Sequence, residues 1–405
     1  MKFKHYRIAD LLDEISMGPF GSNIKKECFV SSGIPVLNGS NLTDVAMNDD
    51  AFRYVTEEKA DSLGKANAHR GDVVVTHRGT LGQISFIPDT SLYDRYVISQ
   101  SQFRFRCNEK VLPEYLTYYF HTRKGQYDLL SNASQVGVPA LARATTTFQQ
   151  LEVDIPDLDE QRKIIGLLED TRKKTELNKK INENLLEQAL AVYKAWFCEY
   201  VLSDGIRPES WSNTTIEELS TLVTRGIAPK YDDNSDQIVL NQKCIRDHTI
   251  DLSLARRHLP KKINEKWIKK GDLLINSTGT GTLGRVAQVW FDANNMTVDS
   301  HVTIVRPKDS ILQGYLGFWG LSHESEIEAQ HTGSTGQTEL PRDRVKSMEL
   351  PQPDEDTLRK FNELIIPLTS AIVSNQEENA RLSQIRDALL PKLMSGEIDV
   401  SELDL

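Results

Sequence analysis

The chain repeats itself at an interval of about 200 residues, and this duplication limits the possible folds more than any other feature. In the clearest match, the run GDVVV at 71–75 corresponds to GDLLI at 271–275. The other matches are GTLGQ at 79–83 with TLGR at 282–285 after a two-residue insertion, Arg106 with Arg306, Tyr115-Leu116 with Tyr315-Leu316, and VDIP at 153–156 with MELP at 348–351. A period this long indicates a duplicated domain rather than a short tandem repeat, and 405 residues suffice for two hydrophobic cores.

Each half has the pattern of a globular part followed by one long helix. Short β-branched and aromatic runs between Gly, Asn and Pro turn signals predict strands at 72–76, 84–87, 103–106, 273–276 and 302–305. From 159 to about 200, apolar residues recur three or four positions apart, which predicts a helix of ~60 Å. The segment 354–394 follows the same plan, with Pro367 and Pro391 as predicted kinks or breaks. Asp159 and Asp354 are available as N-caps of the two helices.

These patterns predict a mixed α+β fold with two globular α/β domains, each followed by a long helix. The two helices are expected to pack antiparallel as a spacer, in a pseudo-two-fold arrangement, although polar residues such as Asn178 interrupt a coiled-coil seam. The predicted boundaries are 1–157 for the first domain, 158–200 for the central helix, 201–353 for the second domain, 354–396 for the distal helix and 397–405 for an acidic tail. Two similar surfaces at a fixed separation suit DNA readers, whose half-sites lie about one helical turn (~34 Å) apart.

Several motifs carry a family resemblance that extends over essentially the whole chain. The order of elements is a globular domain, LNKKINENL at 177–185 running into KAWF at 194–197, a second globular domain, and IRDALLPKLMSGEI at 385–398. Further motifs are NQKCIRD at 241–247, GPFGS at 18–22 and RGTLG at 78–82. In this order and with these motifs, the chain resembles the specificity subunit of type I restriction-modification enzymes.

The resemblance implies a function and a set of partners. In that family each globular part is a target-recognition domain that reads one half of a bipartite DNA sequence, while the helices act as spacer and as the dock for methyltransferase subunits. It therefore implies a non-catalytic cytoplasmic subunit that binds double-stranded DNA and works with two methyltransferase subunits and with restriction/translocase subunits. Because the two domains differ strongly in sequence, an asymmetric target is implied.

Charge and composition agree with this function only locally. The net charge of -10 at first argues against DNA binding, which depends on Lys and Arg contacts to phosphates. Most of the excess of acidic over basic residues, however, lies in 354–405, with eleven acidic and five basic residues, whereas 243–270 holds nine basic and three acidic residues. The four cysteines lie far apart and no apolar run reaches the length of a membrane span, so we expect reduced thiols, no zinc cluster and no membrane.

One motif imitates a cofactor site. GTGTLG at 279–284 matches the dinucleotide-binding pattern, which requires a helix to start at the glycine turn. The following RVAQVWF at 285–291 reads as a strand, and the matching HRGTLG at 77–82 lacks the first glycine, so both are predicted to be hairpin loops. No phosphate-binding loop, HExxH or amino-methyltransferase tetrapeptide occurs, and we predict no cofactor, no metal site and no catalytic residue.

Polar residues in predicted loops are the candidates for DNA contact, because Arg, Lys, Asn and Gln are the side chains that read base edges. In the first half they are Lys25, Asn41, His77, Arg78 and Gln135, with Ser22, Asn23 and Asn38 nearby. In the second half they are Arg225, Asn241, Lys243, Arg246, Thr278, Ser334 and Gln337, with Thr224, Gln242 and Ser277 nearby. For each one, a turn or capping role is the alternative, and only a minority of the set is expected to touch DNA.

Apolar residues near the end of the first long helix are candidates for partner contact. Leu185, Tyr193, Trp196 and Phe197 remain after one helix seam is filled, so they could dock a methyltransferase subunit or seal the junction with the second domain. Two other functions stay open from the residues alone: a self-contained DNA methylase or nuclease fused to recognition domains, and a coiled-coil adaptor that binds only proteins.

Overall fold

The computed structural model describes residues 1–403, except for 22, 135–137, 260–261, 280 and 334–337. The chain forms two compact units. The first unit contains Met1–Thr175 and Ala380–Leu405, and the second contains Glu176–Asn379. Two long helices, α5 (Leu158–Tyr193) and α10 (Glu355–Ser395), each contribute residues to both units. Each unit is therefore a globular part with its own portion of both helices.

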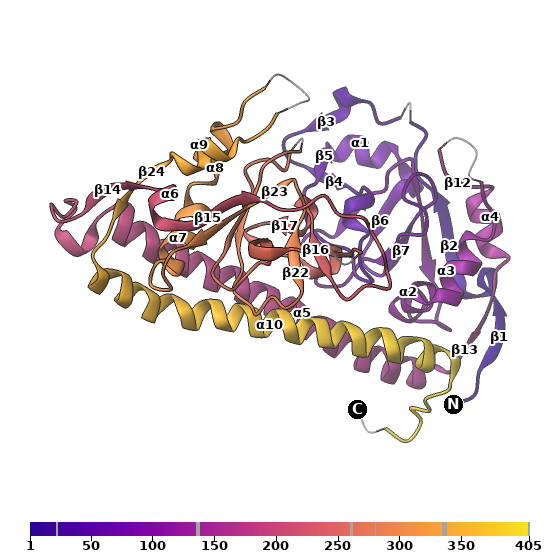
Figure 1. Ribbon diagram of the computed structural model, residues 1–405. Helices are drawn as coiled ribbons and strands as arrows, with labels where there is room; N and C mark the ends of the chain where they lie inside the picture. Colours follow the sequence, from indigo (N-terminus) through magenta and orange to yellow (C-terminus); the bar gives the residue numbers. More distant parts are fainter. Residues whose placement is uncertain (22, 135–137, 260–261, 280, 334–337, 404–405) are drawn as a thin grey trace. The chain divides into compact units, whose positions relative to one another are not determined.

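The first unit is built on two sheets (Figure 1). An antiparallel sheet has the order β2 (Leu12–Met17), β10 (Gln102–Cys107), β7 (Asp72–Thr76), β8 (Ile84–Phe86). A mixed sheet has the order β3 (Phe29–Val30), β5 (Arg53–Val55), β4 (Ile34–Val36), β9 (Arg95–Val97), β6 (Asn67–His69), with β4 and β9 parallel. Two antiparallel pairs complete it: β1 (Lys4–Arg7) with β13 (Glu152–Ile155), and β11 (Ala133–Ser134) with β12 (Ala140–Leu141).

Helices cover the antiparallel sheet of the first unit and complete its core. They are α2 (Pro113–His121), α3 (Arg123–Leu130) and α4 (Ala144–Gln149), whereas α1 (Glu57–Ser62) packs against the mixed sheet through Ala60. Phe103 and Phe105 on β10 pack against Phe148 of α4, with ring centroids 5.3 and 5.0 Å apart. Apolar residues of both long helices, such as Leu168 and Leu393, belong to the same core.

The second unit repeats this architecture. Its antiparallel sheet has the order β15 (Ser220–Arg225), β23 (Val302–Pro307), β20 (Leu273–Asn276), β21 (Val286–Gln288). Its mixed sheet has the order β19 (Arg256–Arg257), β16 (Ile238–Leu240), β22 (Met296–Val298), with β16 and β22 parallel. The pairs are β14 (Ser212–Thr215) with β24 (Glu349–Gln352) and β17 (Ile245–Arg246) with β18 (Thr249–Ile250), and the helices are α6 (Ile216–Leu219), α7 (Leu312–Ser322), α8 (Glu324–Ala329) and α9 (Arg342–Lys346). The predicted strands in both halves are confirmed.

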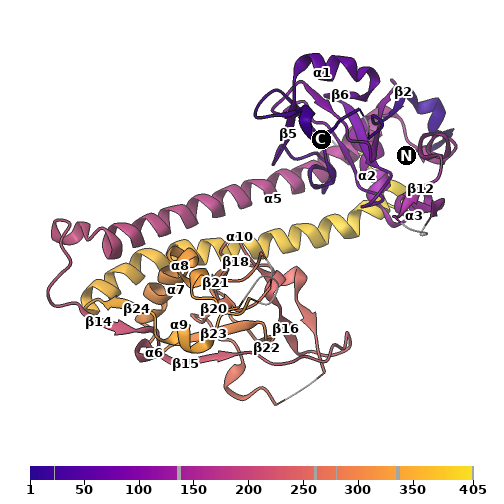
Figure 2. The ribbon, with the colours of Figure 1, turned by 90° about the horizontal axis from the view of Figure 1, so that it is seen from above.

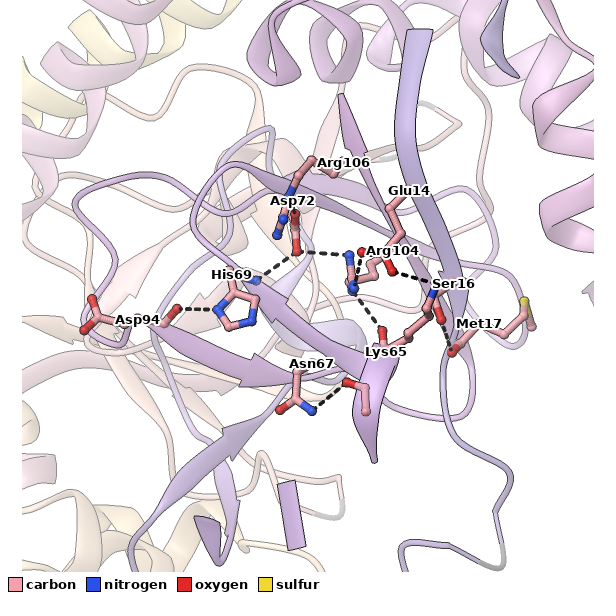
Figure 3. Close-up of polar contacts among 11 residues, drawn as sticks. Glu14, Ser16, Met17, Lys65, Asn67, His69, Asp72, Asp94, Arg104 and Arg106 are labelled. Carbon is pink, nitrogen blue, oxygen red and sulfur yellow. Dashed lines mark hydrogen bonds and ion pairs between the residues drawn. The ribbon is translucent and has the colours of Figure 1, made fainter. Parts of the chain in front are cut away.

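A buried ion pair explains why the repeat preserves an Asp and an Arg 34 residues apart. Asp72 lies on β7 directly opposite Arg106 of β10, and its Oδ1 accepts a 2.8 Å hydrogen bond from Arg106 Nε. Asp272 and Arg306 make the same 2.8 Å bond in the second unit. Both carboxylates are essentially inaccessible to solvent, so the pairing offsets the cost of burying their charge. In the first unit Arg104 joins the pair and also bonds Glu14 (Figure 3).

Each of the two long helices begins directly after a Pro-Asp pair: Pro156-Asp157 precedes α5, and Pro353-Asp354 precedes α10. Asp354 Oδ1 accepts from Thr357 N at 2.9 Å, which confirms its predicted capping role. The prediction for Asp159 is wrong, because Asp157 caps α5 by accepting from Asp159 N and Glu160 N. Of the kinks or breaks predicted at Pro367 and Pro391, the breaks are wrong, since α10 is continuous through both prolines.

Within the second unit the two long helices run antiparallel (Figure 2). Polar side chains join them. Asn178 Nδ2 donates to Glu378 Oε2 at 2.7 Å and to Asn379 Oδ1 at 2.9 Å. Further along α5, Asn182 Oδ1 accepts from Asn375 Nδ2 at 2.7 Å. Asn178 has no exposed surface, so a polar layer replaces part of the apolar seam, and such a layer fixes the register of a helix pair.

Candidate nucleic-acid interface

Both glycine-rich motifs are hairpin turns at the end of an antiparallel sheet. In the first unit the turn 77–83 joins β7 to β8, and in the second unit the turn 277–285 joins β20 to β21. Each turn joins two antiparallel strands and no helix begins among its described residues, so the predicted hairpin loops are confirmed. The described residues of each turn form backbone hydrogen bonds with neighbouring loops.

In the first unit four loops meet at this end of the sheet, and we call their described residues loop cluster 1: residues 38–41, 77–83, 99–101, 132–134 and 138–141. His77 N donates to Ser101 O at 2.8 Å, and Leu141 N donates to His77 O at 2.9 Å. Gly79 N donates to Pro139 O at 3.0 Å. The hairpin turn is thus held between the loop before β10 and the β11–β12 hairpin.

Matching backbone bonds occur in the second unit, whose described loop residues 241–244, 277–279, 281–285, 299–301, 332–333 and 338–340 we call loop cluster 2. Ser277 N donates to His301 O at 2.8 Å, and Leu340 N donates to Ser277 O at 2.8 Å. Thr278 Oγ1 and His301 Nδ1 are 2.7 Å apart. The backbone frame is therefore preserved, while the side chains that it presents differ: His77 and Arg78 stand where the second unit has Ser277 and Thr278.

An asparagine-capped turn completes each cluster. Asn38 Oδ1 accepts from Ser40 N at 2.9 Å, and Asn241 Oδ1 accepts from Lys243 N at 2.8 Å. Each turn packs on the glycine-rich hairpin, and a glycine permits the contact. A Cβ at Gly39 would lie 2.9 Å from Gln83 Oε1, and a Cβ at Gly279, where φ is +104°, would lie 2.6 Å from Gln242 Oε1.

Comparison with known proteins gives one consistent result. Residues 3–187 match the family model of the type I restriction modification DNA specificity domain. The chain is 26% identical to the type I restriction enzyme MjaIX specificity subunit of Methanocaldococcus jannaschii, with 87% of this chain and 83% of that protein covered. It is 24% identical to the type I restriction enzyme HindI specificity subunit of Haemophilus influenzae, with 95% and 99% covered.

A solved structure shares the fold. The crystal structure of the type I restriction-modification system S subunit from M. genitalium aligns over 97% of this chain and 96% of its own, with a TM-score of 0.57 and 14% sequence identity. The predicted mixed α+β fold with two domains and long helices is confirmed. The chain belongs to the specificity subunits of type I restriction-modification enzymes.

This assignment settles the general role. A specificity subunit recognises DNA sequence and is a non-catalytic component of the type I complex. Among the described residues, no group of three or more His, Cys, Asp or Glu could hold a metal ion, and no helix is long and apolar enough to cross a membrane. All four cysteines are free thiols.

Several predicted DNA-contacting residues of the specificity subunit lie on its loop clusters. Arg78 is exposed on the hairpin turn, and His77 beside it is half-buried, with Nε2 3.2 Å from Gln100 O. Burial lowers the pKa of His77, and the neighbouring Arg78 lowers it further, so its imidazole is neutral at pH 7. Lys25, Lys243 and Arg246 are also exposed. Gln135, Ser334 and Gln337 lie outside the described residues.

Other predicted contacts are occupied by structural roles. Asn41 has no exposed surface, and its side chain accepts from Asn38 N at 3.0 Å and donates to Asp50 O at 2.7 Å. Asn41 therefore has no surface available for a base contact. Arg225 is committed as well, because it pairs with Glu339 at 2.6 Å and bonds Leu340 O at 2.9 Å. Asn241 acts as the turn cap and Thr278 bonds His301, although both retain some exposure.

The predicted partner-contacting aromatic residues mostly seal the core of the second unit. Tyr193 and Phe197 are buried, and their rings pack against Tyr315 and Phe361. They have no surface to offer a partner, which corrects the prediction for these two residues. Trp196 is half-buried against the same core, and Leu185 is half-buried on α5. Side chains that are more exposed on this helix are Leu177 (52%) and Ile181 (40%).

Two equivalent arginines, Arg53 at the start of β5 and Arg256 at the start of β19, were missed by reasoning from the sequence. The run VLN occurs at 36–38 and again at 239–241, at an interval of 203 rather than 200 residues. Aligning on this run would have extended the repeat toward the N-terminus of each half and identified further equivalent positions. The strand registers establish Arg53 and Arg256 as one such pair of equivalent positions.

Proposed function

We propose that this specificity subunit reads an asymmetric bipartite DNA sequence, with loop cluster 1 contacting one half-site and loop cluster 2 the other. The observation that carries the proposal is that the same loops occur twice with different side chains. In both units the hairpin turn makes the same backbone bonds to two neighbouring loops, and an asparagine-capped turn packs against it. A conserved frame can position a duplex in the same way twice, and different side chains then select different bases.

The exposed polar residues of each cluster are the proposed base readers. Arg78 can donate two hydrogen bonds to a guanine edge, and neutral His77, whose Nε2–H donates to Gln100 O, can accept one at Nδ1. In the second cluster, Lys243 and His301 are exposed, and Thr278 is half-exposed. Because the two sets share no residue type at equivalent positions, they favour unlike half-sites.

We further propose that the subunit carries methyltransferase subunits, two of them, and restriction/translocase subunits to this site. The long helices would set the spacing between half-sites. The polar layer of Asn178 and Asn182 supports this role, because it holds α5 and α10 in one register within the second unit. The exposed Leu177 and Ile181 on α5 suit contact with a partner protein.

Methylation mapping tests the proposal. Genomic DNA from cells that express this chain with its methyltransferase subunit would be compared with DNA from cells that lack only this chain. We expect methylated adenines in one new motif with two unlike halves and a fixed gap. Methylation by the purified chain alone would favour a self-contained methylase, and an unchanged pattern despite a confirmed complex would favour a protein adaptor; either result would contradict the proposal.

A helix deletion tests the spacer role in the same assay. Removing one turn from α5 and the facing turn from α10 shortens both helices by ~6 Å, close to the length of two base pairs. We expect the gap of the mapped motif to change by one or two base pairs or methylation to be lost. The two half-site sequences should stay the same wherever methylation persists.

A further inference from the structure

Two exposed arginines occupy the same place in the two units. In the first unit β4 pairs with β5 so that Val36 lies opposite Arg53, and Val36 also lies opposite Val97 of the parallel β9. In the second unit Val239 lies opposite Arg256 on β19 and opposite Thr297 on the parallel β22. The registers on both sides of the central strand therefore make Arg53 and Arg256 equivalent.

Each arginine rests on an aromatic ring of its own unit. The guanidinium carbon of Arg53 lies 5.4 Å from the centroid of the Phe29 ring, and that of Arg256 lies 3.4 Å from the centroid of the Tyr231 ring. A guanidinium stacked on a ring keeps its N–H edge free and loses less side-chain entropy when it forms hydrogen bonds. Both arginines are thus held ready for a planar, two-point acceptor.

Their charges are also available. Some other arginines at the surface are paired with carboxylates, such as Arg70 with Asp94 at 2.8 Å and Arg95 with Asp61 at 2.6 Å. Within the described part of the chain, neither Arg53 nor Arg256 has an ion-pair partner. An uncompensated guanidinium on a ring, in a protein of net charge -10, indicates a binding site for an anion.

The position of the arginines places that anion beside the loop clusters. Val36 and Val239 each precede the capping asparagine of a loop cluster, Asn38 or Asn241, by two residues. Each arginine stands at the start of the strand paired with that valine. It therefore lies at the rim of a surface that, under the proposed function, faces a DNA half-site.

We propose that Arg53 and Arg256 are equivalent contacts to the DNA phosphate backbone, one beside each half-site. The inference rests on the proposed function and adds to it. A residue type kept at the same position in two domains that read different sequences is suited to the part of DNA that does not vary with sequence. Phosphate oxygens are also the acceptors that a guanidinium edge binds through two hydrogen bonds.

Binding by the assembled complex of this chain with its methyltransferase subunits tests the proposal. Arg53→Gln and Arg256→Gln would be compared on a duplex with the mapped motif and on a scrambled duplex. Each variant should weaken binding to both duplexes by the same factor, on the order of tenfold, and lower the slope of log affinity against log salt by about 1. The double variant should lower the slope by about 2.

Matched controls separate the site from general charge effects. Arg162→Gln and Arg359→Gln remove one positive charge each from exposed arginines that are ion-paired near the starts of α5 and α10, and we expect the slope to stay unchanged. Phe29→Leu and Tyr231→Leu keep the arginine charge, so the slope should stay the same while affinity falls by about two- to threefold. Arg53→Lys and Arg256→Lys should restore most of the slope, because the charge returns.

Two results would overturn the proposal: an unchanged slope in both Gln variants, or a loss of affinity confined to the motif duplex, which would indicate base contacts. Either can occur while the wild-type complex still methylates a bipartite motif. Failure of the wild-type complex to recognise such a motif would instead contradict the proposed function itself, so the two failures are distinguishable.

Discussion

The two units have the same four-stranded antiparallel sheet but different residues packed against it. In the first unit Arg104 of β10 is buried between Asp72 and Glu14 and bonds Glu14 at 2.8 Å. The equivalent of Arg104 in the second unit is Ile304, which is fully buried in an apolar cluster, and the equivalent of Glu14 is Leu222. A charged pair in one unit has therefore been exchanged for an apolar pair in the other.

The ion pair common to both units did not change in this way. Asp72–Arg106 and Asp272–Arg306 occupy matching positions, and Arg306 donates to the backbone oxygens of Glu265 and Trp267 as well. Each arginine ties β10 or β23 to its neighbouring strand, so replacing one partner would leave a buried charge unpaired. The Arg104–Glu14 ion pair could be exchanged for Ile304 and Leu222 because both residues differ together. The Asp272–Arg306 pair is kept because Arg306 also holds two backbone oxygens.

The loop clusters diverged more freely than the sheets. The backbone bonds of the hairpin turn are the same in both units, but Arg78 is exposed in the first, whereas Thr278 bonds His301 in the second. In loops the backbone frame, and not the side chains, maintains the structure, so residues there can change with little effect on stability. This separation lets one fold read unlike sequences.

The largest effect is expected from converting one core into the other. Arg104→Ile leaves Glu14 without its buried partner and should destabilise the first unit by about 3 kcal/mol. Adding Glu14→Leu recreates the apolar pair of the second unit and should recover all but about 1 kcal/mol. Hydrogen exchange of the β10 amides measures both. Arg162→Ala, which breaks an exposed pair, is the control and should cost less than about 0.5 kcal/mol. A double variant as unstable as the single one would contradict the equivalence of the two cores.

The next effect concerns recognition. Arg78→Ala should weaken binding of the mapped motif by about 1–3 kcal/mol and relax the preference at one base pair of one half-site. Thr278→Ala is the matched variant of the second unit and should alter only the other half-site, by a smaller amount because its hydroxyl is already bonded to His301. Methylation of a duplex library with every position varied measures both. An effect of Arg78→Ala on both half-sites, or on neither, would break the assignment of one cluster to each half.

The general architecture could be predicted from the sequence because its signals are local. Alternating and continuous apolar runs beside glycines, as at Asp72–Thr76 and Leu273–Asn276, are sufficient to identify buried strands. The Pro-Asp pairs likewise mark the helix starts. The duplicated sequence then indicates that the second half repeats the first, which the sheet orders confirm.

The candidate site was less predictable, because exposure depends on tertiary packing. Asn41 and Arg78 are both polar loop residues, yet one is fully buried and the other exposed. Tyr193 and Phe197 lie at helical spacing that suits either a docking surface or a core, and only the position of α7 and α10 decides between them. The equivalence of Arg53 and Arg256 was hidden by a three-residue change in the interval of the repeat.

The helix caps offer a smaller comparison. Asp157→Ala should cost the first unit about 1 kcal/mol, because two backbone N–H groups lose their acceptor. Asp354→Ala should cost somewhat more, since Asp354 also accepts from Trp211 Nε1 at 3.1 Å and Thr357 Oγ1 at 2.9 Å. Hydrogen exchange in the first turn of each helix measures the difference. Asp159→Ala is the control and should be nearly neutral; a larger effect there than at Asp157 would contradict the observed cap.

The smallest effect is a difference in acid sensitivity between the units. His121 lies at the end of α2, where Nε2 is 2.8 Å from Ile84 O, and Leu321 occupies the equivalent position in the second unit. It borders a pocket of about 260 Å³ that is lined by Asp44, Tyr118, Arg386 and Asp387, among others. Burial lowers the pKa of His121 and Arg386 lowers it further, while the Ile84 carbonyl and Asp44 oppose the shift.

The direction of the shift determines the sign of the effect. An unfolded histidine takes up its proton near pH 6.5, whereas folded His121 does so only at a lower pH. The first unit should therefore lose stability as the pH falls below about 6.5, until the folded pKa is reached. His121→Gln keeps an N–H donor for Ile84 O without a titrating group, so hydrogen exchange in α2 should depend less on pH between about 7.5 and 5.5. His5→Gln is the contrasting control, because hydrogen bonding to Asp154 raises the pKa of His5 and its stabilisation is lost as the pH rises instead. If wild-type protein and His121→Gln lose protection equally in acid, then His121 is not the group that makes the first unit more acid-sensitive than the second.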